Sequence, residues 1–388
     1  MDSIAIHNGR VFDSNQKEFI PGSVELDAGS IQTLEFGSSK KSAPEAKIHI
    51  DASRLYVSPG FIDFHGHFFE KGTDIGVDPD LASLPFGVTA VVDAGSTGIS
   101  NFEAFSAQVL KRSRVTMKAF LNMAPAGLVT TQFHEDVNPE LIDEQNIERG
   151  YQANRELLLG LKLRLSKEVI LGHGLEPLKK ARILADKLGC RLNLHMTNPA
   201  ARIAEVLPYL KAGDLFAHMF HGKGETIVKD GQVLPEILKA REQGVLFDAA
   251  NGANHFSFAV ARDSIQCGFL PDIISTDITK NTLMKPPVFS LIHTLSKYLN
   301  MGVCLEDLIP ACTAIPARIM GTDAQMGSIA PGKNADITLF DVIDQAVSFT
   351  DSARKEFVGQ KYIEPVLTVK NGVILFLNPR YVNIIARG

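Results

Sequence analysis

The stretch SPGFIDFHGHFF, residues 58–69, decides the fold. It reads as a short buried strand entered through a proline and a glycine, yet it ends in two histidines, His65 and His67. Residues two apart in a strand point to the same face, so both imidazoles project together, and Asp63 projects with them one step deeper. The stretch therefore predicts a polar site at the carboxyl end of a buried strand, with Asp63 as a partner for the histidine rings.

Seven more apolar runs of strand length follow through the middle of the chain, and amphipathic helical stretches separate them. In one such stretch Leu178, Ala181 and Leu184 have helical spacing, and Gly189 ends it. Eight strand-like runs alternating with helices over residues 57–320 match the size of a (β/α)₈ TIM barrel. An open doubly wound α/β sheet is the alternative. The seven later runs are TAVVDAG, TMKAFLNMA, LLGLKLRLS, RLNLHMT, LFAHMF, LFDAAN and IISTD.

The two ends of the chain have a different sequence pattern, which is typical of short strands. Residues 1–56 and 321–388 contain short alternating runs joined by turns such as Asn8-Gly9 and Asn371-Gly372. Strands so far apart in the sequence can share one sheet. We therefore expect a small β-sandwich module, formed from both chain termini, beside a catalytic barrel of residues 57–320.

The amino-acid composition narrows the classes of function that the chain can have. The chain has 388 residues, 45% of them hydrophobic and 21% charged, which is typical of a globular protein. Its net charge of -5 gives no basic footprint for nucleic acid or an anionic membrane, so a small molecule is the expected partner. Four cysteines lie far apart without a C-x-x-C pair, which favours free buried thiols and a cytoplasmic location.

Polar residues also stand at or near the ends of later apolar runs: Lys162, His195, His218 and Asp277. Each alone has a structural explanation, since a single histidine in an apolar strand is usually a satisfied core residue and a strand-end aspartate often caps a helix. In a barrel, however, the carboxyl ends of the strands meet at one mouth. Together with the H-x-H pair these side chains form an inventory suited to zinc or similar divalent ions, although a protonated lysine would repel a cation.

The order of these motifs resembles that of the amidohydrolase superfamily over nearly the whole chain. The motifs are SPGFIDFHGH, GLKLR, LNLHM, AHMF, STD and GSIAPGKNADITLFD. Relatives such as dihydroorotases, hydantoinases and phosphotriesterases carry the H-x-H pair on strand one, a carboxylated lysine on strand four, histidines on strands five and six, and an aspartate on strand eight. The last motif resembles the return strand into the β module, in which Asp336 is read as structural.

The resemblance implies a binuclear metal centre. His65, His67 and Asp277 would hold one divalent ion, with zinc expected, and His195 and His218 would hold the second. Lys162 would bridge the two ions as a carboxylated, anionic side chain, which removes the charge objection. Two such ions lower the pKa of a shared water, so that a bridging hydroxide attacks an amide or ester carbonyl, with Asp277 as the general acid and base. The resemblance also implies a homo-oligomer.

Three further residues are expected to contact the substrate. Arg164 lies two residues beyond Lys162 on the same strand face and could clamp a substrate carboxylate, although a surface ion pair explains it equally well. Asn251 and His255 follow the seventh run, and His255 could instead cap a loop. His221 should face away from its neighbour His218, which is therefore preferred as the ligand.

The residues after the H-x-H pair narrow the substrate class. Dihydroorotases and allantoinases place an arginine there, but here Phe68, Phe69, Glu70 and Lys71 follow. The chain is therefore more similar to the deacetylase-like branch, whose members remove acyl groups from small hydroxy or amino acids such as acetylated mandelate-type compounds. We expect an acyl hydrolase of a small carboxylate-bearing molecule. A dihydroorotase-like or hydantoinase-like cyclic amidase, a mononuclear nucleobase deaminase and a non-enzymatic binding scaffold are the alternatives.

Overall fold

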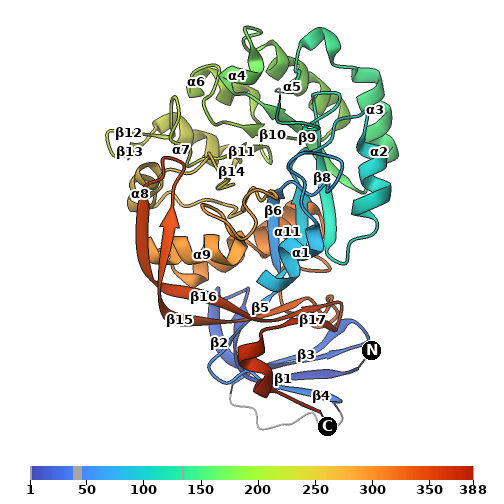
Figure 1. The fold of residues 1–388 in the computed structure, drawn as a ribbon, viewed down its shortest axis with the longest axis vertical. Coiled ribbons are helices and arrows are strands. Elements are labelled where there is room, and N and C mark those ends of the chain that lie inside the picture. The colour runs from blue at the N-terminus through green and yellow to red at the C-terminus, as the bar shows by residue number, and fades with distance from the viewer. Residues whose placement is uncertain (1, 38–45, 133–134, 388) are drawn as a thin grey trace.

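The computed structural model describes residues 2–37, 46–132 and 135–387. A barrel of strands surrounded by helices occupies one end of the molecule, and a sheet that contains both chain termini occupies the other (Figure 1). Within the described residues, no helix is both long and apolar enough to cross a membrane.

Seven parallel strands form the barrel sheet, and neighbours in the sequence are neighbours in space. Their side chains are almost all buried, because helices cover the outer face and the strands pack against one another inside. In spatial order the strands are β6 (Phe61–Gly66), β7 (Val88–Asp93), β8 (Thr116–Asn122), β9 (Leu158–Arg164), β10 (Arg191–His195), β11 (Leu215–Ala217) and β14 (Leu246–Asp248).

The eighth expected strand is irregular, but it closes the barrel. Residues 273–278 are not assigned as a strand, yet they form parallel bridges from Asp248 to Ile273 on one side and from Gly66 to Ile278 on the other. Their backbone accepts hydrogen bonds from Ala249 and donates one to the carbonyl of His65. This confirms the TIM barrel and rejects the open doubly wound sheet.

The helices follow from the patterns in the sequence. Helix α5 begins with a proline in its first turn and buries the stripe that contains Leu178, Ala181 and Leu184. It ends at Gly189, whose φ of +62° suits glycine. The α-helices are α1 (Pro79–Ser83), α2 (Phe102–Phe105), α3 (Glu144–Ala153), α4 (Lys167–Ile170), α5 (Glu176–Leu188), α6 (Ile203–Val206), α7 (Pro235–Glu242), α8 (Phe258–Gln266), α9 (Leu291–Asn300), α10 (Leu305–Ala311) and α11 (Ala314–Met320).

The second sheet joins the two ends of the chain, which confirms the module built from both termini. The first half of β1 pairs with β4 and its second half with β5, and β5 pairs in turn with β15 from the far end of the sequence. The structural reading of Asp336 is consistent with its contacts, because it accepts hydrogen bonds from Lys370 Nζ (2.7 Å) and the Asn371 backbone (2.8 Å). The strands are β1 (Ile4–Asp13), β2 (Glu18–Asp27), β3 (Ser30–Phe36), β4 (Ile48–Asp51), β5 (Tyr56–Pro59), β15 (Ile337–Thr350), β16 (Glu356–Lys370), β17 (Val373–Leu377) and β18 (Ile385–Arg387).

Strands β15 and β16 form a long hairpin that leaves this sheet and runs beside α9 toward α8 (Figure 1). At its tip the Ser352 backbone donates to the Phe256 carbonyl (2.9 Å), and the Asp351 carboxylate accepts from the Phe258 backbone (3.4 Å). The carboxyl-terminal segment therefore braces the loop that follows β14.

All four cysteines are free thiols, as expected, but the expectation that they are buried is wrong for two of them. Cys312 is buried and Cys190 is half-buried, whereas Cys267 and Cys304 are exposed.

Candidate metal centre

A cavity of about 270 Å³ opens at the carboxyl ends of the barrel strands. Every site residue expected from the sequence lines it, except Asn251. The lining residues that the sequence indicated are His65, His67, Lys162, Arg164, His195, His218, His255 and Asp277.

The first group of candidate ligands consists of His65, His67 and Asp277. Its ligand atoms all lie within 4.8 Å of one another. Asp277 Oδ1 is 3.1 Å from His67 Nε2 and 3.8 Å from His65 Nε2. Asp277 adopts a φ of +53°, a conformation that is uncommon for residues other than glycine and that clusters at functional sites.

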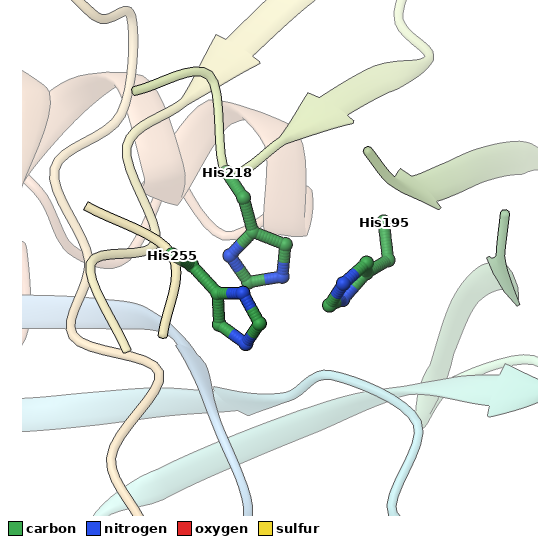
Figure 2. Close-up of side chains that lie close together, drawn as sticks. All are labelled: His195, His218 and His255. Atoms are coloured by element: carbon green, nitrogen blue, oxygen red, sulfur yellow. The ribbon is translucent and has the colours of Figure 1, made fainter. Parts of the chain in front are cut away.

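The second group consists of His195, His218 and His255, whose rings point toward a common centre (Figure 2). The ring centroids are 4.2 Å apart for His195 and His218, 4.2 Å for His218 and His255, and 4.7 Å for His195 and His255. Two of these histidines were expected as ligands from the sequence. The third, His255, was expected as a substrate contact, and the structure places it within ligand distance of the others.

Lys162 lies inside the same cavity. Its Nζ is 3.5 Å from His65 Nε2 and donates to Asn193 Oδ1 at 3.1 Å. Burial lowers the pKa of this amine to about 8, although Asp277, Asp248 and Glu135 oppose the shift. The Lys162 stem passes close to Gly95, where a Cβ would lie 2.7 Å from Lys162 Cβ, so glycine leaves room for the side chain.

The rings of His65 and His67 are oriented by hydrogen-bond partners at their Nδ1 atoms. His65 Nδ1 is 3.0 Å from Asp248 Oδ2, and His67 Nδ1 is 2.9 Å from Ser96 Oγ. Ser96 Oγ in turn donates to Asp93 Oδ2 at 2.7 Å. These contacts to Nδ1 leave Nε2 of each ring directed at Asp277, which is the arrangement that metal-binding histidines need.

The second group is oriented by neutral groups. His218 Nδ1 is 2.7 Å from the Ala250 carbonyl, and His255 Nδ1 is 2.8 Å from Thr197 Oγ1. Gly252 allows the close approach of its loop, because a Cβ there would lie 2.5 Å from His255 Cδ2.

The donor set fits divalent cations. Burial, followed by neighbouring cationic groups, lowers the pKa of His65, His195 and His218 well below the usual value, so these imidazoles are neutral and can donate a lone pair. His195 Nε2 is buried and has no hydrogen-bond partner within the described part of the chain. A buried polar atom without a partner is costly unless a ligand satisfies it, and a metal ion at this position would do so.

Arg164 faces the cavity but already has acidic neighbours. Its guanidinium is 3.3 Å from Glu135 and 3.5 Å from Glu168. Glu135 is buried and lines the same cavity, so the cationic Arg164 and the anionic Glu135 lie side by side at the cavity wall.

Asn251 and His221 do not line the cavity, which contradicts the expected substrate contact of Asn251. Asn251 points into the core, where its amide donates to the Ser275 carbonyl and its oxygen accepts from Tyr298. His221 is buried and does not line the cavity, which agrees with the preference for His218.

Asp63 does not support the histidine rings, contrary to the expectation from strand alternation. It accepts hydrogen bonds from the Thr276 backbone (3.0 Å) and the Thr276 hydroxyl (2.5 Å), and so holds the segment that carries Asp277. Burial raises the pKa of Asp63 to about 7.

Four functional residues were not expected from the sequence: the supporting residues Asp248, Ser96 and Asn193 and the acidic wall residue Glu135. Asp248 offered a signal, because it ends the LFD run in the same way that Asp277 ends IISTD. Glu135 offered none, since it lies in a long loop without a recognisable pattern.

Comparisons with known proteins agree with this geometry. The profile of the Amidohydrolase family matches residues 56–375. The Agrobacterium fabrum protein named Deacetylase Atu3266 is 35% identical over 320 residues, which cover 81% of this chain and 77% of that protein.

Solved structures resemble the whole chain. A crystal structure described as a dihydroorotase superposes with a TM-score of 0.87 at 30% identity and covers 98% of this chain and 100% of its own. Another, described as an adenine deaminase, has a TM-score of 0.87 at 27% identity and covers 97% of this chain and 99% of its own.

Proposed function

This chain belongs to the amidohydrolase family, and from that premise we propose that it is a deacetylase-like hydrolase of a small carboxylate-bearing molecule and uses two divalent ions. The observation that carries the proposal is that two three-residue ligand groups and Lys162 line one cavity. Relatives named deacetylases, with 35% and 34% identity over most of the chain, support the acyl-hydrolase reading.

We assign His65, His67 and Asp277 to one ion and His195 and His218 to the other. Our assignment of Lys162 as a carboxylated bridge is supported by the 3.5 Å between its Nζ and His65 Nε2. We take both ions to be zinc, because neutral imidazole and carboxylate are ligands that zinc favours. A pair of such ions supplies an acidified water and polarises the substrate carbonyl.

The chain's own groups then handle the protons. Asp277 Oδ1 faces the two histidines of its group, while Oδ2 lies 3.7 Å from His255 Nε2. Asp277 can therefore take the proton of the attacking water and deliver it to the leaving group. His255, fixed by Thr197, faces the same space and is placed to contact the substrate.

Arg164 is our candidate for the substrate carboxylate. Because Glu135 already neutralises part of its charge, the clamp is weaker than an unpaired arginine would provide. Arg164→Gln should raise KM for an N-acetyl amino acid more than KM for the matching neutral N-acetyl amide. Equal effects on both substrates would remove Arg164 from the substrate site.

The decisive experiment is a metal analysis combined with an activity screen. Both enantiomers of N-acetyl and O-acetyl acids should be tested, and we expect hydrolysis with a preference for one enantiomer. A chelator should abolish the activity until zinc is restored. The metal content should approach two ions per chain and fall in Lys162→Ala. Full activity after complete metal removal would refute the proposal.

The same experiment tests the alternatives suggested by the similar structures described as a dihydroorotase and an adenine deaminase. A mononuclear deaminase would hold about one ion and keep its activity in Lys162→Ala. A cyclic amidase would open dihydroorotate or a hydantoin and leave linear acyl compounds intact. The burial of Lys162 in the cavity that both ligand groups line, with its Nζ 3.5 Å from His65 Nε2, favours the binuclear reading.

A further inference from the structure

A second cavity, of about 550 Å³, lies at the opposite end of the barrel from the metal centre. Its walls come from the amino-terminal ends of the strands: Lys118 near the start of β8, Leu158 at the start of β9 and Arg191 at the start of β10. Arg318, near the end of α11, completes it. The ligands of the metal centre stand at the carboxyl ends of these strands, so the two cavities are separated by the depth of the barrel.

Basic side chains dominate this cavity, in a protein whose net charge is -5. The cationic residues in its wall are Lys118, Arg155, Arg182, Arg191, Lys211 and Arg318, and the acidic ones are Asp186 and Asp214.

The two acids are already engaged. Arg182 pairs with Asp214 at 2.6 Å and with Asp186 at 2.8 Å, and Lys211 pairs with Asp186 at 2.8 Å. These four side chains neutralise one another.

The other four cations, Lys118, Arg155, Arg191 and Arg318, have no ion pair and no side-chain hydrogen bond to any residue that the structure describes. The residues that line the cavity therefore carry an excess of four formal positive charges, and Glu156 is an acidic neighbour of Lys118. Like charges around one space repel each other.

One buried nitrogen and one half-buried amine point to a missing partner. Arg182 is 9% exposed, and its Nε is buried without a hydrogen-bond partner among the described residues. Lys118 is half-buried, and burial lowers its pKa, with Glu156 as an opposing influence. Because Arg182 already pairs with Asp186 and Asp214, a further acceptor would satisfy only its Nε–H and the amine of Lys118.

We propose that this cavity is a binding site for a small polyanion, a molecule that carries phosphate groups or several carboxylates. Guanidinium groups bind such oxyanions through paired hydrogen bonds. The volume falls in the range of about 300–1,000 Å³ that is typical of small-molecule sites, so the cavity holds more than a single inorganic ion. A ligand there would tie together β8, β10 and α11 and stabilise the barrel by mass action.

Calorimetric titration of the full, metal-loaded protein with pyrophosphate and with citrate tests the proposal. We expect one saturable site per chain that weakens as salt is raised. The double variant Arg191→Gln/Arg318→Gln should weaken binding by about 100-fold, roughly tenfold for each lost charged hydrogen bond. Tighter binding of pyrophosphate would identify a phosphate ligand, and tighter binding of citrate would identify a polycarboxylate.

Arg112→Gln is the matched control, because Arg112 is exposed and does not line the cavity, so its binding should be unchanged. If the double variant does not fold, Lys118→Gln replaces it, with an expected loss of about tenfold. The proposal is overturned if the folded protein binds neither probe, or if the variants bind as well as the parent, which would place the anion at the metal centre. The titration measures binding and not turnover, so it is independent of the proposed hydrolase activity.

Discussion

The two halves of the candidate metal centre are built differently. In the first half, buried carboxylates stand behind the histidines: Asp248 behind His65, and Asp93, through Ser96, behind His67. In the second half, a carbonyl and a hydroxyl occupy the same positions behind His218 and His255.

This difference has an electrostatic consequence. A carboxylate behind an imidazole raises its basicity as a ligand, whereas a neutral acceptor only orients the ring. The first half should therefore bind its ion more tightly, and the second half should depend more on the bridge from Lys162 and on the brace from the β15–β16 hairpin.

The largest effect is expected at Asp277, the residue that faces both halves. Asp277→Asn removes the carboxylate that accepts the proton of the attacking water, so kcat should fall on the order of 10³- to 10⁴-fold. Steady-state kinetics and metal analysis of the same preparation check this. A variant that keeps both ions and more than about a tenth of the activity would contradict the role of Asp277 as general base.

The contrast between the halves can be measured directly through the supporting residues. Asp248→Asn should weaken the first ion by about 10- to 100-fold, because the charged partner of His65 is lost. Thr197→Val removes a neutral hydrogen bond to His255, a neighbour of the second ion's ligands, and should change metal affinity by at most about fivefold. Titration with a competing chelator gives both constants. Equal losses in the two variants would show that the carboxylates do not distinguish the halves.

Assembly of the bridge should depend on pH. Carboxylation requires the neutral amine of Lys162, and burial lowers the pKa of that amine to about 8. The neutral fraction rises as pH increases toward this value, so apoprotein supplied with zinc and a fixed concentration of dissolved CO₂ should recover activity faster at roughly pH 8 than at roughly pH 6. Recovery that is independent of pH would argue against carboxylation.

The smallest effect should come from the hairpin tip. Asp351→Ala removes a buried carboxylate that accepts from the backbone of Phe258 and Lys355, at a cost of about 1–3 kcal/mol in the free energy of unfolding. Because this tip braces the loop that carries His255, kcat should fall by a few fold while the first ion stays bound.

Asp344→Ala is the control on the same hairpin. Asp344 forms an exposed pair with Lys361, so its loss should change stability by less than about 1 kcal/mol. Denaturant unfolding compares the stabilities of the two variants. Equal stabilities would show that the hairpin tip does not support the second half of the metal centre.

Much of the fold, but only part of the candidate site, could be predicted from the sequence. Runs such as LLGLKLRLS predicted the barrel because parallel strands buried on both faces are continuously apolar. The ligand set was reached only with the family resemblance, since spacing alone cannot connect His65 to Asp277 across 212 positions of the chain. The eighth strand-like run closes the barrel as expected, but it is irregular, and hydrogen bonds to its two neighbours keep it extended.

By itself, the sequence determined which side chains stand at strand ends, because alternation and helical spacing are local and survive without knowledge of the fold. Only the tertiary structure decided which of those side chains meet. In the folded chain, His255 lies beside His195 and His218. The side chain of Asn251 points into the core, and His65 contacts Asp248 instead of Asp63. The tertiary structure also gathers four unpaired cations from distant segments around one cavity. Such encounters depend on barrel closure and loop paths, which no local pattern encodes.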